Sequence, residues 1–313
     1  MLRPLRFLPD DTSIVFMPIA RKGFYVSMVL CVLSIGLFFV EGLNYGIDFR
    51  GGTLIEIKTQ GPADLGDLRS RMSSLGLGDT ELQEFGEPDD VLIRIATQPG
   101  GEEAQQAAVD KVKAALPPGV DYRRVEVVGP KVSGELARDG TIAVVVAICA
   151  VLIYIWFRFE WQFAFGAVAS LAHDVILTIG LFAILQIGFD LSIIAAILTI
   201  VGYSLNDTVV VFDRFRENLR RYKQKPLDEI IDQSLNQTLP RTIMTSISTL
   251  VALIALYVFG GEVIRGFTFA MIWGVVVGTY SSIFIAAPVL IFLGARIGTA
   301  AGDAKAEAEK ARP

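Results

Sequence analysis

The stretch LSIIAAILTIVGYSLNDTVVVFDRFR, Leu191–Arg216, decides the fold class of this 313-residue chain. It is an apolar run long enough to cross a bilayer core, yet it carries Asn206 and Asp207. At about 1.5 Å per residue, Asp207 lies roughly 9 Å inside the charged end that begins at Asp213. A carboxylate at such a depth costs about 2.5–3.5 kcal/mol, which indicates a functional role. The alternative is a hydrogen bond to a neighbouring helix that serves packing alone.

Composition extends this conclusion to the whole chain. Hydrophobic residues make up 52% of the sequence and the mean hydropathy is +0.52, above the range of soluble domains. We therefore expect a polytopic α-helical membrane protein with six transmembrane helices. The apolar runs are Phe24–Val40, Thr141–Phe157, Phe163–Ile187, Leu191–Phe212, Ile243–Val258 and Phe267–Leu293. Both cysteines, Cys31 and Cys149, lie inside these runs, as small apolar residues do.

Basic residues predict the orientation, because short cytoplasmic loops are enriched in lysine and arginine. They cluster before the first apolar run and after the fourth, whereas the short loops on the other side hold only Arg265. The first run lacks a cleavage signal and is expected to stay as an anchor. The expected order is a cytoplasmic segment 1–23, helix 1 at 24–40, a periplasmic α/β domain at 41–139, helices 2–6 within 140–296 with a basic cytoplasmic loop at 214–239, and a disordered cytoplasmic tail at 297–313.

The polar segment 41–139 has the pattern of a small α/β domain. Alternating residues predict strands, and helical spacing predicts two helices between them. The strands are Thr53–Thr59, Thr80–Phe85, Val91–Thr97 and Asp121–Val128, and the helices Pro62–Gly76 and Glu102–Leu116. We expect a ferredoxin-like βαββαβ domain inserted between transmembrane helices 1 and 2, with the second and third strands joined by the turn GEPDD.

Glycine-rich segments flank this domain and are expected to be linkers. They are GLNYGIDFRGGT, Gly42–Thr53, and VGPKVSGELARDG, Val128–Gly140. Gly51 and Gly52 allow a sharp turn or a close approach to another segment. A phosphate-binding loop is disfavoured, because neither a following helix nor a Lys-Ser/Thr ending is present.

Six sequence motifs, spread along the chain, resemble those of a known protein family. They are GIDFRGG (Gly46–Gly52), VGPKVSGEL (Val128–Leu136), AHD (Ala172–Asp174), GYSLNDTVVVFDRFREN (Gly202–Asn218), LPRTIMTSISTL (Leu239–Leu250) and FGGEVIRGFTFAMIWGVVVGTYSSIFIA (Phe259–Ala286). In these motifs, and in their order along nearly the whole chain, the sequence resembles the SecF subunits of the SecD/SecF family. This family belongs to the bacterial Sec export machinery and to the resistance-nodulation-division superfamily.

The resemblance implies a function and a set of partners. A SecD-like subunit would supply a second six-helix half, and the pair would use the proton motive force to promote late steps of protein export. The expected partners are also the Sec channel, exported unfolded polypeptides and lipids of the bacterial inner membrane. The resemblance assigns the proton-carrying carboxylate to Asp207, with the proton as coupling ion and no cofactor.

The residues themselves suggest a counter-ion for Asp207. Arg241 follows Pro240, which is expected in the first turn of the fifth span, on the same membrane side as Asp207. A carboxylate near a movable cation can switch between charged and neutral forms. The alternative is that Arg241 only anchors the helix at the interface. Thr245, Ser248 and Thr249 share its helical face and, with Asn206 near Asp207, would hold water or brace helices.

Asp174, near the middle of the third span, is a second carboxylate candidate. We expect its neighbour His173, the only histidine, to be a packing or hydrogen-bonding residue rather than part of a proton relay with Asp174, because adjacent helical residues point about 100° apart. Small residues at helical spacing, Gly274 with Gly278 and Gly166 with Ser170, predict close helix packing. Local ion pairs are expected among Asp213, Arg214, Arg216 and Glu217.

Two other functional classes stay open at this point. One is half of a proton-driven small-molecule or lipid exporter of the same superfamily, although the outer domain is small for that. The other is a scaffold subunit without transport, whose buried charges are structural. An enzyme is not expected, because the outer domain and loops hold no nucleophile–base set and no metal-ligand spacing, and nucleic-acid binding has no support.

Overall fold

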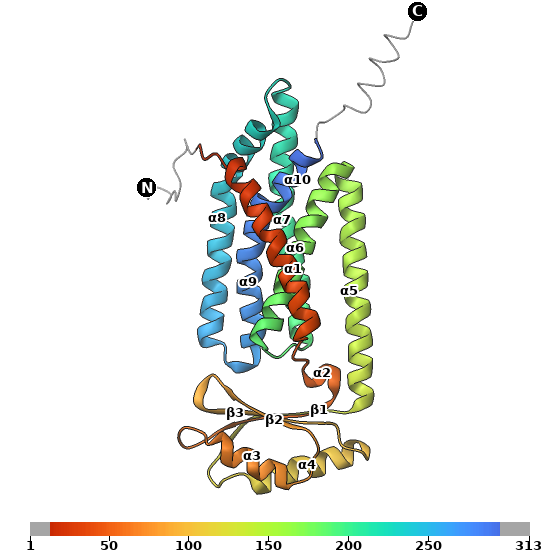
Figure 1. The fold of residues 1–313 in the computed structure, drawn as a ribbon, viewed down its shortest axis with the longest axis vertical. Coiled ribbons are helices and arrows are strands. Elements are labelled where there is room, and N and C mark those ends of the chain that lie inside the picture. Colours follow the sequence, from red (N-terminus) through yellow and green to blue (C-terminus); the bar gives the residue numbers. More distant parts are fainter. Residues whose placement is uncertain (1–12, 295–313) are drawn as a thin grey trace, which may run out of the picture. The chain divides into compact units, whose positions relative to one another are not determined.

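The computed structural model describes residues 13–294, which divide into two compact units. The first contains most of the long helices (Figure 1), and the second consists of Asn44–Val145 with Gly188–Leu191. The expected tail at 297–313, and the first half of the expected segment 1–23, lie outside the described residues.

Within residues 13–294, six helical stretches are long and apolar enough to cross a membrane, as predicted. They are α1 (Met17–Val40), α5 (Pro130–Arg158), α6 (Trp161–Leu185), α7 (Leu191–Arg221), α8 (Leu227–Phe259) and a last one. The last stretch is continuous through α9 (Arg265–Ser281), the π-helical turn η2 (Ser282–Ala286) and α10 (Ala287–Phe292), and it follows the 3-10 turn η1 (Glu262–Ile264). The chain is therefore a multi-pass membrane protein.

The expected loop at 214–239 is wrong, because α7 and α8 extend into it and leave only residues 222–226 between them. Apolar residues continue at helical spacing among the charges, and Phe215 and Leu235 are both 1% exposed. Asn218 is also buried and its side-chain amide donates to Ser234 Oγ and Gln237 Oε1, each at 2.9 Å. The two helix extensions therefore form a packed hairpin.

Two prolines also differ from their expected places. Pro130 opens α5, so Val128–Gly140 is not a linker: a proline suits the first turn of a helix, where its missing N–H has no partner to lose. Pro240 lies inside α8, not at the start of a helix, because α8 begins thirteen residues earlier at Leu227. The expected transmembrane boundaries at 140 and 243 thus mark changes in polarity within continuous helices.

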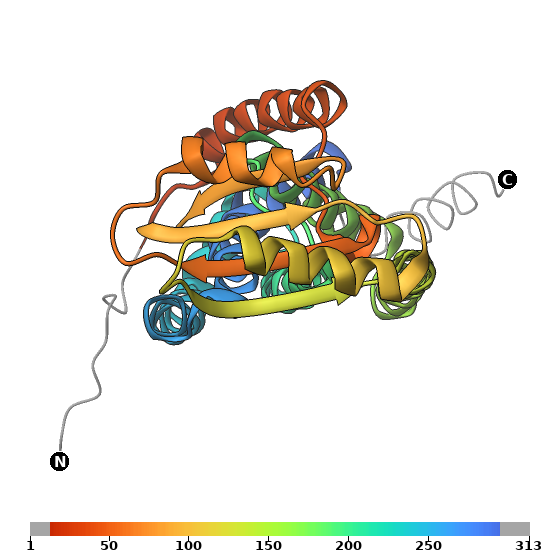
Figure 2. The ribbon, with the colours of Figure 1, turned by 90° about the horizontal axis from the view of Figure 1, so that it is seen from below.

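The second unit has the predicted ferredoxin-like order. After the short α2 (Ile47–Arg50) come β1 (Gly52–Lys58), α3 (Leu65–Ser74), β2 (Thr80–Phe85), β3 (Glu87–Ile95), α4 (Gly101–Ala115) and β4 (Asp121–Val128). The sheet order is β2-β3-β1-β4 and every neighbouring pair is antiparallel. Figure 2 shows α3 and α4 side by side on one face of the sheet. Ile55, Ile93 and Val112 are fully buried in the core beneath them.

Glycine is required at the start of β1. Gly51 and Gly52 have φ angles of 70° and 111°, and a Cβ on Gly52 would lie 2.3 Å from the carbonyl oxygen of Ile95. This confirms the close approach predicted for the pair. The predicted GEPDD turn is wrong, however, because β3 begins at Glu87 and leaves Gly86 alone between the two strands.

Candidate functional site

Asp207 lies on the inner face of α7 and is 9% exposed. Its Oδ1 accepts a hydrogen bond from Thr242 Oγ1 of α8 at 2.6 Å, and its Oδ2 accepts one from Ser282 Oγ at 2.8 Å. Ser282 is the first residue of the π-helical turn, a feature that often occurs at functional sites. The carboxylate therefore ties three helical segments together through hydroxyl groups.

Arg241 does not form an ion pair with Asp207 in this structure. Its neighbour Thr242 contacts the carboxylate instead, while Arg241 itself is exposed on α8. An Asp207–Arg241 pair in another state of the protein stays a prediction.

The predicted polar lining faces outward. Asn206, Thr245 and Ser248 are exposed along with Arg241, and Thr249 is half-buried. The Thr245 hydroxyl lies 3.1 Å from the Arg241 carbonyl oxygen, and the Ser248 hydroxyl donates to the Thr245 carbonyl at 3.0 Å. These two hydroxyls thus bond within α8 itself, and like Asn206 and Arg241 they are exposed on the surface of this chain.

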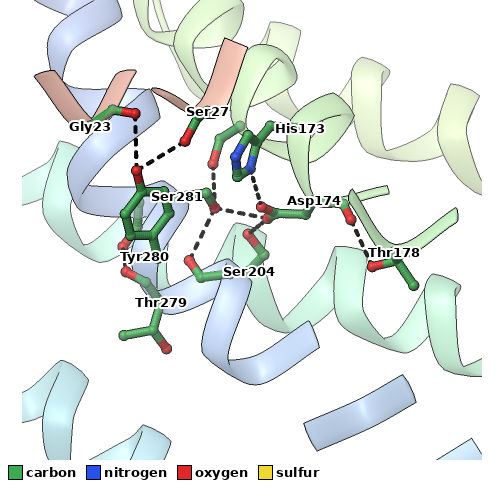
Figure 3. Close-up of polar contacts among 12 residues, drawn as sticks. Gly23, Ser27, His173, Asp174, Thr178, Ser204, Thr279, Tyr280 and Ser281 are labelled. Carbon is green, nitrogen blue, oxygen red and sulfur yellow. Dashed lines mark hydrogen bonds and ion pairs between the residues drawn. The ribbon is translucent and has the colours of Figure 1, made fainter. Parts of the chain in front are cut away.

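A second polar cluster surrounds Asp174 on α6 (Figure 3), whose side chain is fully buried. Its Oδ2 accepts from Ser204 Oγ of α7 at 2.6 Å and from Ser281 Oγ of α9 at 2.8 Å. Its Oδ1 lies 2.9 Å from Nδ1 of His173. The expectation that these adjacent residues point apart was wrong, because the imidazole ring turns back to its neighbour's carboxylate.

Ser281 extends this cluster across the bundle. Ser170 Oγ of α6 donates to Ser281 Oγ at 2.9 Å, and the hydroxyl of the adjacent Tyr280 donates to the Gly23 carbonyl of α1 at 3.1 Å. The neighbouring residues Ser281 and Ser282 therefore donate hydrogen bonds to different carboxylates, Ser281 to Asp174 and Ser282 to Asp207.

Glycines allow the helices to come this close. A Cβ on Gly274 would lie 2.1 Å from Ile200 Cγ1, and one on Gly278 would lie 2.9 Å from Ser204 Cβ. A Cβ on Gly166 would meet the Ala286 carbonyl oxygen at 3.2 Å. The predicted small-residue packing is confirmed, and it places Ser204 against α9 where it reaches Asp174.

The partners Ser204, Thr242, Ser281 and Ser282 were not identified as site residues from the sequence. The pair Ser281–Ser282 in the apolar segment TYSSIFIA was the available signal, because two adjacent hydroxyls on a helix face different neighbours. Single serines and threonines gave no signal, since they usually bond to their own helix.

The charged residues at the end of α7 form one ion pair within the helix and two with residues of other helix ends. Arg214 pairs with Glu217 at 2.8 Å, as predicted for i, i+3 neighbours. Asp213 instead pairs with Arg158 of α5, and Arg216 lies 3.9 Å from Glu160. These ion pairs connect the ends of α5 and α6 to α7.

Comparison with known proteins identifies the family. Residues 108–296 match the model of the protein export membrane protein SecD/SecF C-terminal region, and residues 36–63 match the SecD/SecF GG motif. The chain belongs to the SecD/SecF family. The residues that match the GG motif include the adjacent glycines Gly51 and Gly52 at the start of β1.

Among the family members, relatives of similar length are named protein translocase subunit SecF. The one from Magnetococcus marinus is 51% identical, with 91% of this chain and 94% of the relative aligned. The one from Cereibacter sphaeroides is 45% identical, with 96% of each chain aligned. A relative from Brucella abortus, named protein translocase subunit SecDF, is 45% identical, but this chain covers 40% of its length.

Solved SecDF structures have the same fold. The crystal structure of SecDF from Thermus thermophilus, described as a translocon-associated membrane protein, aligns with a TM-score of 0.83 and 34% identity. The alignment covers 91% of this chain and 39% of that one. SecDF in a super-membrane-facing form aligns with a TM-score of 0.69 and 33% identity, over 99% of this chain and 42% of that one. This chain thus spans about two fifths of the SecDF polypeptides.

Proposed function

We propose that the chain is the SecF-type subunit of a Sec protein translocase and works with a SecD-type partner. Together they use the proton motive force to promote late steps of protein export across the bacterial inner membrane. The similarity to SecF subunits, and to a SecDF relative of which this chain covers 40%, supports a SecD-type partner.

The observation that carries this proposal is Asp207, buried in an apolar span and held by two hydroxyl groups. A carboxylate in such surroundings changes its charge when a cation approaches or leaves. Uptake of a proton changes its hydrogen bonds to Thr242 and Ser282, which lie on two other helical segments. Arg241, next to Thr242, supplies the cation for the ionised form in another state of the cycle.

The exposed polar residues Asn206, Arg241, Thr245 and Ser248 support a partner subunit. Polar side chains that face hydrocarbon are costly, so another protein surface is expected to cover them. A SecD-type subunit placed there would also bring a second set of polar groups close to Asp207.

The basic residues support the orientation. Arg21 near the start of α1 pairs with Asp228 at the start of α8 at 2.7 Å, so both helix starts lie at the same end of the bundle. The arginines of the α7 hairpin lie at that end too, and the positive-inside rule assigns it to the cytoplasm. The domain at 41–139 would then be periplasmic, where exported polypeptides emerge from the Sec channel.

The test replaces Asp207 in cells that depend on this gene for export. Asp207→Asn keeps the size but cannot carry a proton, so we expect loss of export of a secreted reporter and of proton uptake by membrane vesicles. Asp207→Glu keeps a titratable group and should retain part of both activities. Asp213→Asn, an exposed acid on the same helix, is the matched control and should behave as wild type.

The outcomes separate the alternatives. Wild-type export and proton uptake in Asp207→Asn would leave the carboxylate as structural and favour a scaffold. Lost proton uptake with unchanged protein export would favour a small-molecule or lipid exporter.

A further inference from the structure

Asp174 is a fully buried carboxylate without a permanent counter-charge. Among the described residues, the only ion-pair partner of Asp174 is His173, and its other contacts are the hydroxyls of Ser204 and Ser281. Both side chains of the His173–Asp174 pair are at most 1% exposed. Because a lone carboxylate is costly to bury, the pair needs one proton to stay neutral as a unit.

His173 has a ring nitrogen that no described side chain satisfies. Its Nδ1 lies against Asp174, and its Nε2 is buried without a hydrogen-bond partner among the described residues. Tyr280 stacks on the imidazole with ring centroids 6.0 Å apart, but its hydroxyl bonds to Gly23 and Ser27 of α1. When Nδ1 donates to the carboxylate, Nε2 carries a free lone pair and can accept a proton.

We propose that His173 and Asp174 form a second, enclosed protonation site that holds one proton and is coupled to Asp207. The proton neutralises the pair either as imidazolium with carboxylate or as imidazole with carboxylic acid. It enters and leaves through Nε2, and no other bond forms or breaks. The coupling to Asp207 rests on the function proposed above, whereas the occupancy of the pair does not.

The structure provides a short connection between the two sites. Ser281 donates to Asp174, and the adjacent Ser282 donates to Asp207. A change in the charge of either carboxylate therefore acts on one of two serines that are neighbours in the chain. Ser204 and Asp207 are also successive residues of one face of α7. Two carboxylates this closely linked in a medium of low dielectric do not lose their protons independently.

The other groups that face the pair are few. From α1 the thiol of Cys31 lies within electrostatic range of Asp174, and from α9 Tyr280 covers the imidazole. From α7 the facing group is the Ser204 hydroxyl, with Asp207 one turn further along. Among the described residues, no lysine or arginine forms an ion pair with Asp174, so protonation of the pair itself has to balance the charge.

The test uses the fact that this chain has a single histidine. The full-length chain, labelled with ¹⁵N-histidine and placed in lipid nanodiscs, gives one imidazole signal whose protonation state NMR reports. Infrared difference spectra report a carboxylic acid, and Asp174→Asn identifies the Asp174 band. At neutral pH we expect either an imidazolium signal that is lost in Asp174→Asn, or a carboxylic acid band that is lost in the same variant.

Coupling is tested by Asp207→Asn, which removes the second charge and should lower the protonated fraction of the pair severalfold at a given pH. Asp213→Asn on the same helix is the control and should leave that fraction unchanged. If Asp174→Asn does not fold, Ser204→Ala and Ser281→Ala replace it: each removes one donor to the carboxylate, and should shift the proton distribution between imidazole and carboxyl.

Two results would overturn the inference. A neutral imidazole with no carboxylic acid band from Asp174 would make the pair a simple packing contact. A histidine signal that does not respond to Asp207→Asn would refute the coupling, even if the same variant loses export. Lost export with an unchanged histidine signal therefore leaves the proposed function intact and rejects this inference alone.

Discussion

The packing of α9 on α7 allows one prediction with a worked magnitude. In Gly274→Ala the new methyl group would lie 2.1 Å from Cγ1, 2.2 Å from Cδ1 and 2.7 Å from Cγ2 of Ile200. Rotation of Ile200 about χ1 would not relieve this clash, because isoleucine is branched at Cβ and its second branch would move into the place of the first. Overpacking costs about 1–3 kcal/mol, and alanine regains about 0.5–1 kcal/mol over glycine in a helix. We expect a net change between about zero and a loss of about 2.5 kcal/mol in the free energy of unfolding, that is about 1–3 kcal/mol below a site where the alanine methyl meets no neighbour.

The measurement is unfolding in mixed micelles by heat or by added SDS, followed through the fluorescence of Trp273 and the other tryptophans. Gly36→Ala on α1 is the matched control, because nothing lies within 4 Å of its added Cβ. Ile200→Ala alone leaves a cavity and costs about 2–5 kcal/mol. The double variant should lose less free energy of unfolding than the two single variants lose together, by about 1–3 kcal/mol. If Gly274→Ala is as stable as Gly36→Ala, the close contact does not exist as described.

Three further predictions concern other parts of the chain. Asp48→Ala removes the carboxylate that accepts the N–H of the first residue of α7 at 3.0 Å and should cost about 1 kcal/mol in thermal unfolding. Asn218→Ala breaks one buried and one partly buried hydrogen bond and should cost about 1–3 kcal/mol while exposing the α7–α8 hairpin to protease. With Cys149 replaced by serine, an impermeant thiol reagent should label Gln106→Cys in intact spheroplasts but Lys223→Cys only after lysis.

The two stability predictions have matched control variants, and the labelling prediction has an outcome that would contradict it. Asp48→Asn keeps an acceptor oxygen and should unfold near the wild-type temperature. If Asp48→Asn and Asp48→Ala lower the unfolding temperature equally, the hydrogen bond to the first residue of α7 does not stabilise the protein. Asp213→Asn breaks only an exposed ion pair and should cost no more than about 1 kcal/mol, so a larger loss there than in Asn218→Ala would contradict our account of the hairpin. Labelling of Lys223→Cys before lysis would invert the proposed topology.

The fold was largely predictable because the hydrophobic effect acts on patterns that the sequence shows directly. Strands β2 and β4 have the expected bounds, and each predicted apolar run falls within one of the long helical stretches or passes its end by no more than about two residues. The predicted ends of the helices were wrong where a helix continues beyond its apolar run. Phe215 and Asn218 continue a buried face among arginines, and an apolar-run criterion ends the helix at the first charges.

The candidate site was predicted less completely. Asp207 and Asp174 were identifiable because an acid inside an apolar span is rare. Their partners were not, since a serine on one helix reaches a carboxylate on another only through the packing of both. Thr242 rather than Arg241 contacts Asp207, a choice that depends on the rotation of α8, and one residue of rotation is about 100°.

The π-helical turn at Ser282–Ala286 also affects how this chain compares with its relatives. Such a turn accommodates one more residue than an α-helical turn, so it corresponds to a one-residue insertion absorbed within a continuous helix. The helix is buried on both sides of this turn, with Ser281 before it 0% exposed and Leu290 after it 1% exposed. An alignment with a relative whose last span is an uninterrupted α-helix therefore needs a one-residue gap here, and without the gap each residue of α10 would be matched to a position about 100° away around the helix.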